Sequence, residues 1–155
     1  MSGPMEITEV AWQRAPQGSP TGYYNSFNLY LAAASGSELT DTYEDNYVAG
    51  TRVLVYSTTQ LVMSANPDEW SAITLDTPYW YDGTGNLILE FDWVGGSNMF
   101  FTYMWDTGSN RGLMNTSDVH SPTGILQANV SELRFDGPLA LVPATFAEIK
   151  TLGTP

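Results

Sequence analysis

The chain has 155 residues, no cysteine, and a formal net charge of −12 from five basic and seventeen acidic side chains. This length predicts one domain with its own core, the charge argues against nucleic acid and anionic membrane surfaces as partners, and the lack of cysteine excludes disulfides and thiolate zinc sites. Aromatic residues at 13%, with 14 glycines and 9 prolines, are typical of an all-β domain with many turns.

The first half of the chain predicts strands separated by loops. Residues 5–12 alternate apolar and polar side chains, which is the period of a strand with one buried face. Residues 14–21 are rich in Pro, Gly and Ser and predict a loop, and the acidic stretch 38–46 predicts another. Further strands are predicted at 27–31, 51–56 and 70–75.

The segment 77–91 is the clearest β-hairpin in the sequence. Its aromatic run at 79–81 stops at Asp82-Gly83, where Asx and Gly residues tolerate positive φ, and an apolar run restarts after Asn86. Shorter strands are predicted at 99–105, 111–115, 125–128 and 130–135. Short strands with a turn about every 8–12 residues predict an all-β sandwich, jelly-roll-like in architecture.

We expect the sandwich to occupy residues 13–137, with an N-terminal extension or strand at 1–12 and a C-terminal tail at 138–155. The tail starts with an apolar, Pro-punctuated stretch and continues with a capping-box pattern at 145–148. Residues 1–6 show neither the basic nor the apolar region of a signal peptide, which leaves the route of export open. No apolar run approaches the roughly 20 residues that span a bilayer, so no membrane insertion is expected.

Several of these segments together resemble a β-sandwich module, jelly-roll-like, of bacterial secreted and cell-surface proteins. The segments that carry the likeness are NSFNLYL at 25–31, VLVY at 53–56, WSAITL at 70–75, TPYWYDG at 77–83, NLILE at 86–90 and LRF at 133–135. Residues 145–152 are also similar to a tail at the ends of some secreted bacterial proteins, with Phe146 in place of Trp. The resemblance implies an extracellular or cell-surface location and no catalysis, and it transfers no active-site residue.

The candidate catalytic residues favour a protein that is not an enzyme. His120 is the only histidine, and it lies beside a Pro turn with no evident nucleophile or carboxylate partner. Glu90 and Asp92 lie two residues apart on a predicted strand, so both point to one face. Such a pair suits glycoside chemistry or a cation, but carboxylates at this spacing more often form the solvated face of an amphipathic strand.

Calcium is the one cofactor that the sequence makes a candidate. Asp82 and Asn86 place oxygen ligands around a flexible turn, and Asp41 and Asp45 do so in the acidic stretch 38–46. Neither segment has the spaced ladder and final Glu of a helix-flanked calcium loop. A plain turn and a plain acidic loop therefore remain the alternatives.

Tyr79, Trp80 and Tyr81 are candidate ligand or partner residues. Adjacent residues of a strand point to opposite faces, so at least one of the three must point away from the core. An exposed Tyr or Trp stacks on sugar rings or anchors a protein partner. The alternative is packing against neighbouring strands on the second face of a sheet.

The leading functional prediction is a non-catalytic extracellular structural module that assembles with copies of itself. Such a module is a subunit of a surface filament, sheath or layer, or of a virus particle, and its terminal strands complete a neighbour's sheet. The alternative is a glycan-binding module of a secreted protein. Self-association of the protein would support the structural module, and binding to a glycan would support the glycan-binding module.

Overall fold

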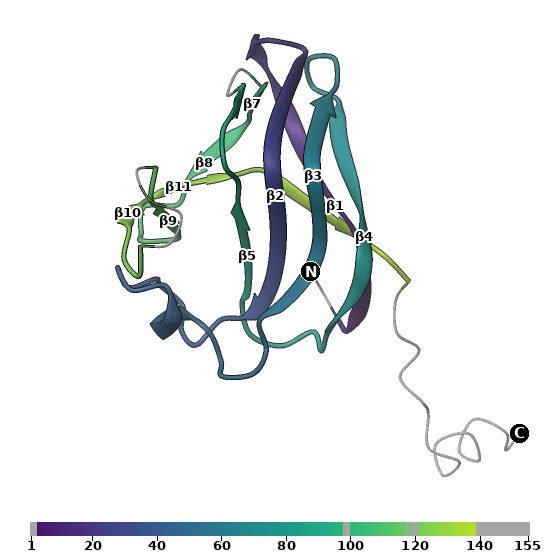
Figure 1. Ribbon diagram of the computed structural model, residues 1–155. Coiled ribbons are helices and arrows are strands. Elements are labelled where there is room, and N and C mark those ends of the chain that lie inside the picture. Colours follow the sequence, from purple (N-terminus) through teal and green to yellow (C-terminus); the bar gives the residue numbers. More distant parts are fainter. Residues whose placement is uncertain (1–2, 98–99, 117, 119–120, 139–155) are drawn as a thin grey trace, which may run out of the picture.

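The computed structural model describes residues 3–97, 100–116, 118 and 121–138 (Figure 1). Two antiparallel sheets face each other, one in the order β12-β1-β4 and the other in the order β3-β2-β5. Their strands are β1 (Met5–Gly18), β2 (Thr21–Ala33), β3 (Val53–Ser64), β4 (Trp70–Tyr81), β5 (Leu87–Asp92) and β12 (Leu133–Asp136). The predicted all-β sandwich is confirmed.

Strands β1 to β4 form one long antiparallel ribbon that folds over on itself. β2 pairs with β3 through residues 21–31 and 53–64, and β1 pairs with β4 through residues 5–13 and 70–81. The ribbon crosses from one sheet to the other at two turns, one between β1 and β2 and one between β3 and β4. Gly18, with a φ of 78°, lies at the first of these turns. A folded ribbon of this kind gives the jelly-roll-like arrangement.

Apolar side chains from the strands of both sheets fill the space between them. Ile7 and Val10 of β1, Leu29 and Leu31 of β2, and Val55 of β3 are fully buried there. Each of these strands therefore has one face in the core and one face outside. The outer face of a sheet carries the side chains that remain free for function.

β1 is a central strand of its sheet. The sequence predicted an N-terminal extension or strand at residues 1–12, and the described part of this segment is a strand that pairs with β4 on one side and with β12 on the other. Local alternation shows that a strand has a buried face and does not show how many neighbours it has. The tail residues 139–155 lie outside the described residues.

A two-stranded arm leaves the sandwich at Tyr103. It follows the short strands β6 (Gly96–Ser97) and β7 (Phe100–Thr102), which pair with β2 and β1. In the arm, β8 (Met104–Asp106) pairs with β11 (Asn129–Ser131), and β9 (Gly112–Met114) pairs with β10 (Ile125–Gln127). The sequence had placed these segments in the sandwich itself.

The tip of the arm contacts the acidic loop between β2 and β3. This loop contains the short 3₁₀ turn η1 (Glu44–Asn46), and Figure 1 shows η1 near β9 and β10. The Gly124 amide donates to the Asp41 carbonyl at 2.8 Å, and the Tyr43 amide donates to the Pro122 carbonyl at 3.0 Å. The acidic loop is thus held on two sides, by the sandwich and by the arm.

Candidate functional site

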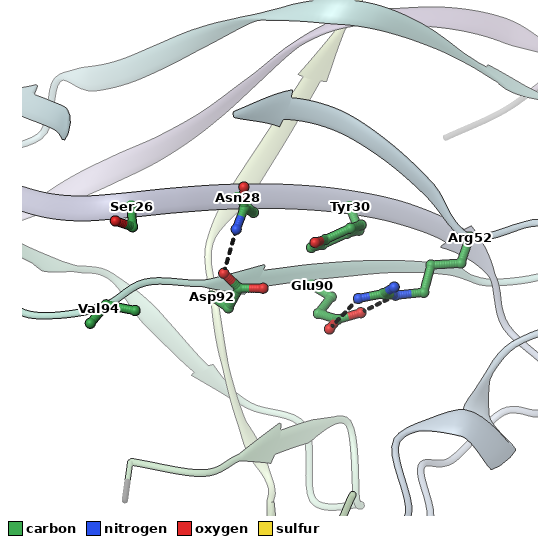
Figure 2. A pocket seen from close by; sticks show the side chains of 7 residues that line it. All are labelled: Ser26, Asn28, Tyr30, Arg52, Glu90, Asp92 and Val94. Atoms are coloured by element: carbon green, nitrogen blue, oxygen red, sulfur yellow. Dashed lines mark hydrogen bonds and ion pairs between the residues drawn. The ribbon is translucent and has the colours of Figure 1, made fainter. Parts of the chain in front are cut away.

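A depression of about 370 Å³ lies on the outer face of β2 and β5 (Figure 2). The residues that line it are Ser26, Asn28 and Tyr30 from β2, Arg52 just before β3, Glu90 and Asp92 from β5, and Val94 just after it. Alternate residues of a strand share a face, so the lining side chains point outward, while Leu29 is fully buried and the Phe91 ring, although 40% exposed, stacks on the core residue Phe27. Register brings the lining together, because Asn28 lies opposite Asp92 and Tyr30 opposite Glu90.

Ser26 reaches the depression through an unusual backbone conformation. Its φ of 49° lies in the left-handed region of backbone conformation, which residues other than Gly rarely adopt. Tyr24 and Phe27 lie on either side of this kink and are three residues apart in the sequence. Both nevertheless pack against the core, with ring centroids 6.2 Å apart. The kink therefore shifts the alternation of β2 by one residue. Among the described residues the Ser26 hydroxyl has no hydrogen-bond partner.

Arg52 and Glu90 form the charged end of the depression. The Arg52 guanidinium donates to both Glu90 oxygens, at 2.7 and 2.9 Å, and the Tyr47 hydroxyl donates to Glu90 Oε2 at 2.6 Å. The guanidinium also lies 3.8 Å from the centroid of the Tyr30 ring, which is cation–π geometry. The hydrogen bond to Glu90 raises the pKa of Arg52 above its ordinary value. These four side chains are fixed by one another before any ligand arrives.

Asp92 forms the other end, and it is held by a different chain of hydrogen bonds. The Ser57 hydroxyl donates to Asn28 Oδ1 at 2.8 Å, and Asn28 Nδ2 donates to Asp92 Oδ1 at 2.8 Å. In Figure 2 the Asn28 and Asp92 side chains point toward one another across the two strands. Asp92 Oδ2 accepts no hydrogen bond from the described residues, so an oriented acceptor stays available.

The three predicted aromatic residues do not form one surface. Tyr79 and Tyr81 point into the core and are 8% and 9% exposed, whereas Trp80 between them is 58% exposed. Trp80 lies opposite Glu6 on the outer face of the β12-β1-β4 sheet, which is not the sheet that carries the depression. Of the three, only Trp80 is placed to meet a ligand or partner.

The four predicted calcium residues lie in two loops. Asp82 Oδ1 accepts hydrogen bonds from the amide and the hydroxyl of Thr84, and these bonds lower the pKa of Asp82. Asn86 donates to the Gly36 carbonyl, Asp41 accepts from the neighbouring Thr42 hydroxyl, and Asp45 accepts through its main-chain carbonyl. No group of three or more His, Cys, Asp or Glu side chains in the described residues is placed to hold a metal ion. Calcium binding stays a prediction.

The carboxylate pair is on one face of β5, as its spacing predicted. Both Glu90 and Asp92 line the depression. Glu90, however, is engaged by Arg52 and Tyr47 through both of its oxygens. Its carboxylate therefore already accepts three hydrogen bonds from within the protein. His120 lies outside the described residues.

The arm offers a second exposed surface, and it is apolar. Met104, Trp105, Met114 and Ile125 are each between 46% and 68% exposed. Side chains of this kind mark contact surfaces when they gather in a patch. Nothing among the described residues covers them.

We expect five of the nine tyrosines to ionise only at unusually alkaline pH. Burial raises the pKa of Tyr24, Tyr43, Tyr47 and Tyr79, and a hydrogen bond to Asp68 raises that of Tyr103. Because these folded-state values are raised, their contribution to stability is complete below about pH 10 and is lost as the pH rises through the folded-state values. Residue-resolved NMR titration of the tyrosine rings checks this.

A single substitution tests the cause of the largest of these shifts. Glu90 raises the pKa of Tyr47 through a hydrogen bond and through its charge, in addition to burial, and its charge also acts on Tyr43. Glu90→Gln should therefore lower the pKa of Tyr47 most and that of Tyr43 next, and leave Tyr24 unchanged. A Tyr47 that titrates identically in both proteins contradicts the network around Glu90.

Comparisons with known protein families, with curated proteins and with solved structures found no match to this chain. Among the residues that the structure describes, no helix is long and apolar enough to cross a membrane. The depression and its side chains are therefore the features of this chain that point to a function.

Proposed function

We propose that this protein is a non-catalytic glycan-binding module of an extracellular protein and that the depression over β2 and β5 takes the sugar. The observation that carries the proposal is the combination of fixed and free polar groups in one depression. Hydrogen bonds fix Asn28, Arg52 and Glu90, while Asp92 Oδ2 and the hydroxyls of Ser26 and Tyr30 have no partner among the described residues.

Sugar hydroxyls both donate and accept hydrogen bonds, so their site must offer both kinds of partner. Asp92 supplies an acceptor, and the Ser26 and Tyr30 hydroxyls supply groups that do either. Val94, which is 63% exposed, adds an apolar contact beside them. Because the supporting network is formed in advance, less ordering of side chains is required on binding, which favours affinity.

The non-catalytic part of the proposal rests on Glu90. A glycosidase needs two carboxyl groups that reach the scissile bond, one as acid and one as base or nucleophile. Arg52 and Tyr47 occupy both oxygens of Glu90, which leaves Asp92 as the one lining carboxylate with a free oxygen. The extracellular location rests on the resemblance of the sequence to modules of secreted bacterial proteins.

Self-assembly by exchange of the N-terminal strand is not proposed. β1 pairs on both sides within its own sandwich and buries Ile7 and Val10, so it cannot add to a neighbour without unfolding its own domain. The corresponding role for the apolar tail at 139–142 falls on residues that the structure does not describe, and it stays a prediction.

A glycan panel tests the proposed function. The unmodified protein should bind at least one class of glycan, and Asn28→Ala should weaken that binding at least tenfold, because it removes the support of Asp92 and a lining side chain together. Trp80→Ala serves as the matched control on the other sheet and should leave the affinity unchanged. If Trp80→Ala alone lost binding, the site would lie on the other sheet and the depression would not be the binding site. A protein that binds no glycan would refute the proposal.

A further inference from the structure

We infer that the depression prefers glycans that carry a protonated amino group, such as glucosamine oligomers, over their neutral N-acetylated counterparts. This inference rests on the proposed function and specifies the ligand class of the same site. It comes from the uneven distribution of charge along the depression.

The positive charge in the depression is already neutralised. Arg52 forms a two-point ion pair with Glu90, at 2.7 and 2.9 Å, so these two side chains together carry no net charge. Asp92 takes part in none of the ion pairs between described residues, and its one hydrogen bond comes from the neutral Asn28 amide. A charge of −1 therefore remains at the Asp92 end of the depression.

The groups around Asp92 suit an ammonium ion. Asn28 lies directly opposite Asp92, so Ser26 and Tyr30, two residues to either side on β2, are the diagonal neighbours on the same outer face. An ammonium group has three donors and no acceptor. It can donate to Asp92 Oδ2 and to a flanking hydroxyl, whereas an N-acetyl amide offers one donor and an acceptor that faces a carboxylate.

The charge of the whole chain acts in the same direction. Seventeen acidic residues face five basic ones. Of the basic side chains, Arg14 is buried, and Arg52 and Arg134 are paired with carboxylates. A surface with so little free positive charge attracts cationic ligands and repels anionic ones over distances of about a Debye length. Glycans with carboxylate or sulfate groups are accordingly the least suitable ligands.

The size of the preference follows from the type of hydrogen bond. A bond between charged partners contributes more than a neutral one by about 1 kcal/mol, which corresponds to a roughly fivefold to tenfold tighter complex. The preference should weaken as salt is added, because Asp92 lies in an open depression where screening is effective.

Calorimetric titration with a matched pair of ligands tests the inference. The glucosamine tetramer and the N-acetylglucosamine tetramer are titrated at about pH 6 and low ionic strength into the unmodified protein, Asp92→Asn and Asp106→Asn. Both variants lose one negative charge, but Asp106 is an exposed residue of the arm and does not line the depression. Asp106→Asn therefore separates the overall charge from the contact at Asp92.

The expected result is fivefold to tenfold tighter binding of the amino form by the unmodified protein and by Asp106→Asn. Asp92→Asn should bind the two tetramers equally, because its side-chain amide carries no charge that favours the amino form. Equal binding by the unmodified protein, a preference that survives in Asp92→Asn, or binding of other glycans but of neither tetramer would each overturn the inference while the proposed function stands. A protein that binds no glycan at all overturns both.

Discussion

A chain that begins at residue 13 should not fold. The deletion removes the stretch of β1 that pairs with β4 and β12 and takes Ile7, Val10 and Trp12 out of the core. Full burial of an apolar side chain of this size contributes about 1.5–3 kcal/mol, so the losses together are comparable with the net stability of a domain, about 5–15 kcal/mol. Circular dichroism and the dispersion of amide NMR signals measure the result.

Point substitutions in the full chain keep this prediction open to test if the deleted chain is insoluble. Ile7→Ala should lower the free energy of unfolding by about 2–5 kcal/mol, because it removes a fully buried side chain between the sheets. Val62→Ala is the matched control, since Val62 is 56% exposed on β3, and it should change stability by about 0.5 kcal/mol or less. If the chain without residues 1–12 folds and the two substitutions change stability equally, β1 is not a central strand of the sandwich.

Replacing Glu90 by Ala should weaken glycan binding at least tenfold, or by about 1.4 kcal/mol. Glu90 holds the Arg52 guanidinium over the Tyr30 ring and accepts the Tyr47 hydroxyl bond, so its loss releases one whole end of the depression. The free energy of unfolding should fall by only about 1 kcal/mol, because the ion pair is partly exposed to solvent. Calorimetric titration and denaturant unfolding give the two values separately.

Glu69→Ala is a control for this substitution. Glu69 also accepts two hydrogen bonds, both from Asn66, but it lies in the turn between β3 and β4 and does not line the depression. Its substitution should leave glycan affinity unchanged. Equal affinity of Glu90→Ala and the unmodified protein would show that the network around Glu90 does not organise the site.

Local patterns in the sequence were sufficient for the strands, but the hairpin predicted at 77–91 is wrong, because β4 and β5 lie in different sheets and pair with β1 and β2. The run 79–81, the turn at Asp82-Gly83 and the restart after Asn86 appear in the structure as β4, a turn and β5. Alternation also required that the adjacent aromatic residues separate, and Trp80 alone of the three is exposed. These features depend on neighbours within a few residues, which a sequence shows directly.

The position of β1 and the arm could not be obtained in the same way. Whether a strand has one neighbour or two depends on segments far along the chain, and β12 pairs with β1 across more than one hundred residues. The arm strands β8 and β9 are three residues long, which is too short for their own pattern to show which sheet they join. Only the partner that each strand takes distinguishes the arm from the sandwich.

Only the part of the depression on β5 could be predicted from the sequence. The spacing of Glu90 and Asp92 predicted a shared face, and the structure places both in the lining. Asn28 and Tyr30 have the same spacing on β2, but their role depends on the pairing of β2 with β5, which joins positions about sixty residues apart. Arg52 could not be recognised as a partner of Glu90 before that pairing was known.

Titration of isotope-labelled protein with the best ligand of the glycan panel, followed through backbone amide signals, tests whether the depression over β2 and β5 is the binding site. The largest shifts should occur at Ser26, Asn28 and Tyr30 of β2 and at Glu90 and Asp92 of β5, with no shift at Trp80. Shifts gathered around Trp80 and Glu6, with the β2 and β5 signals unmoved, would contradict it.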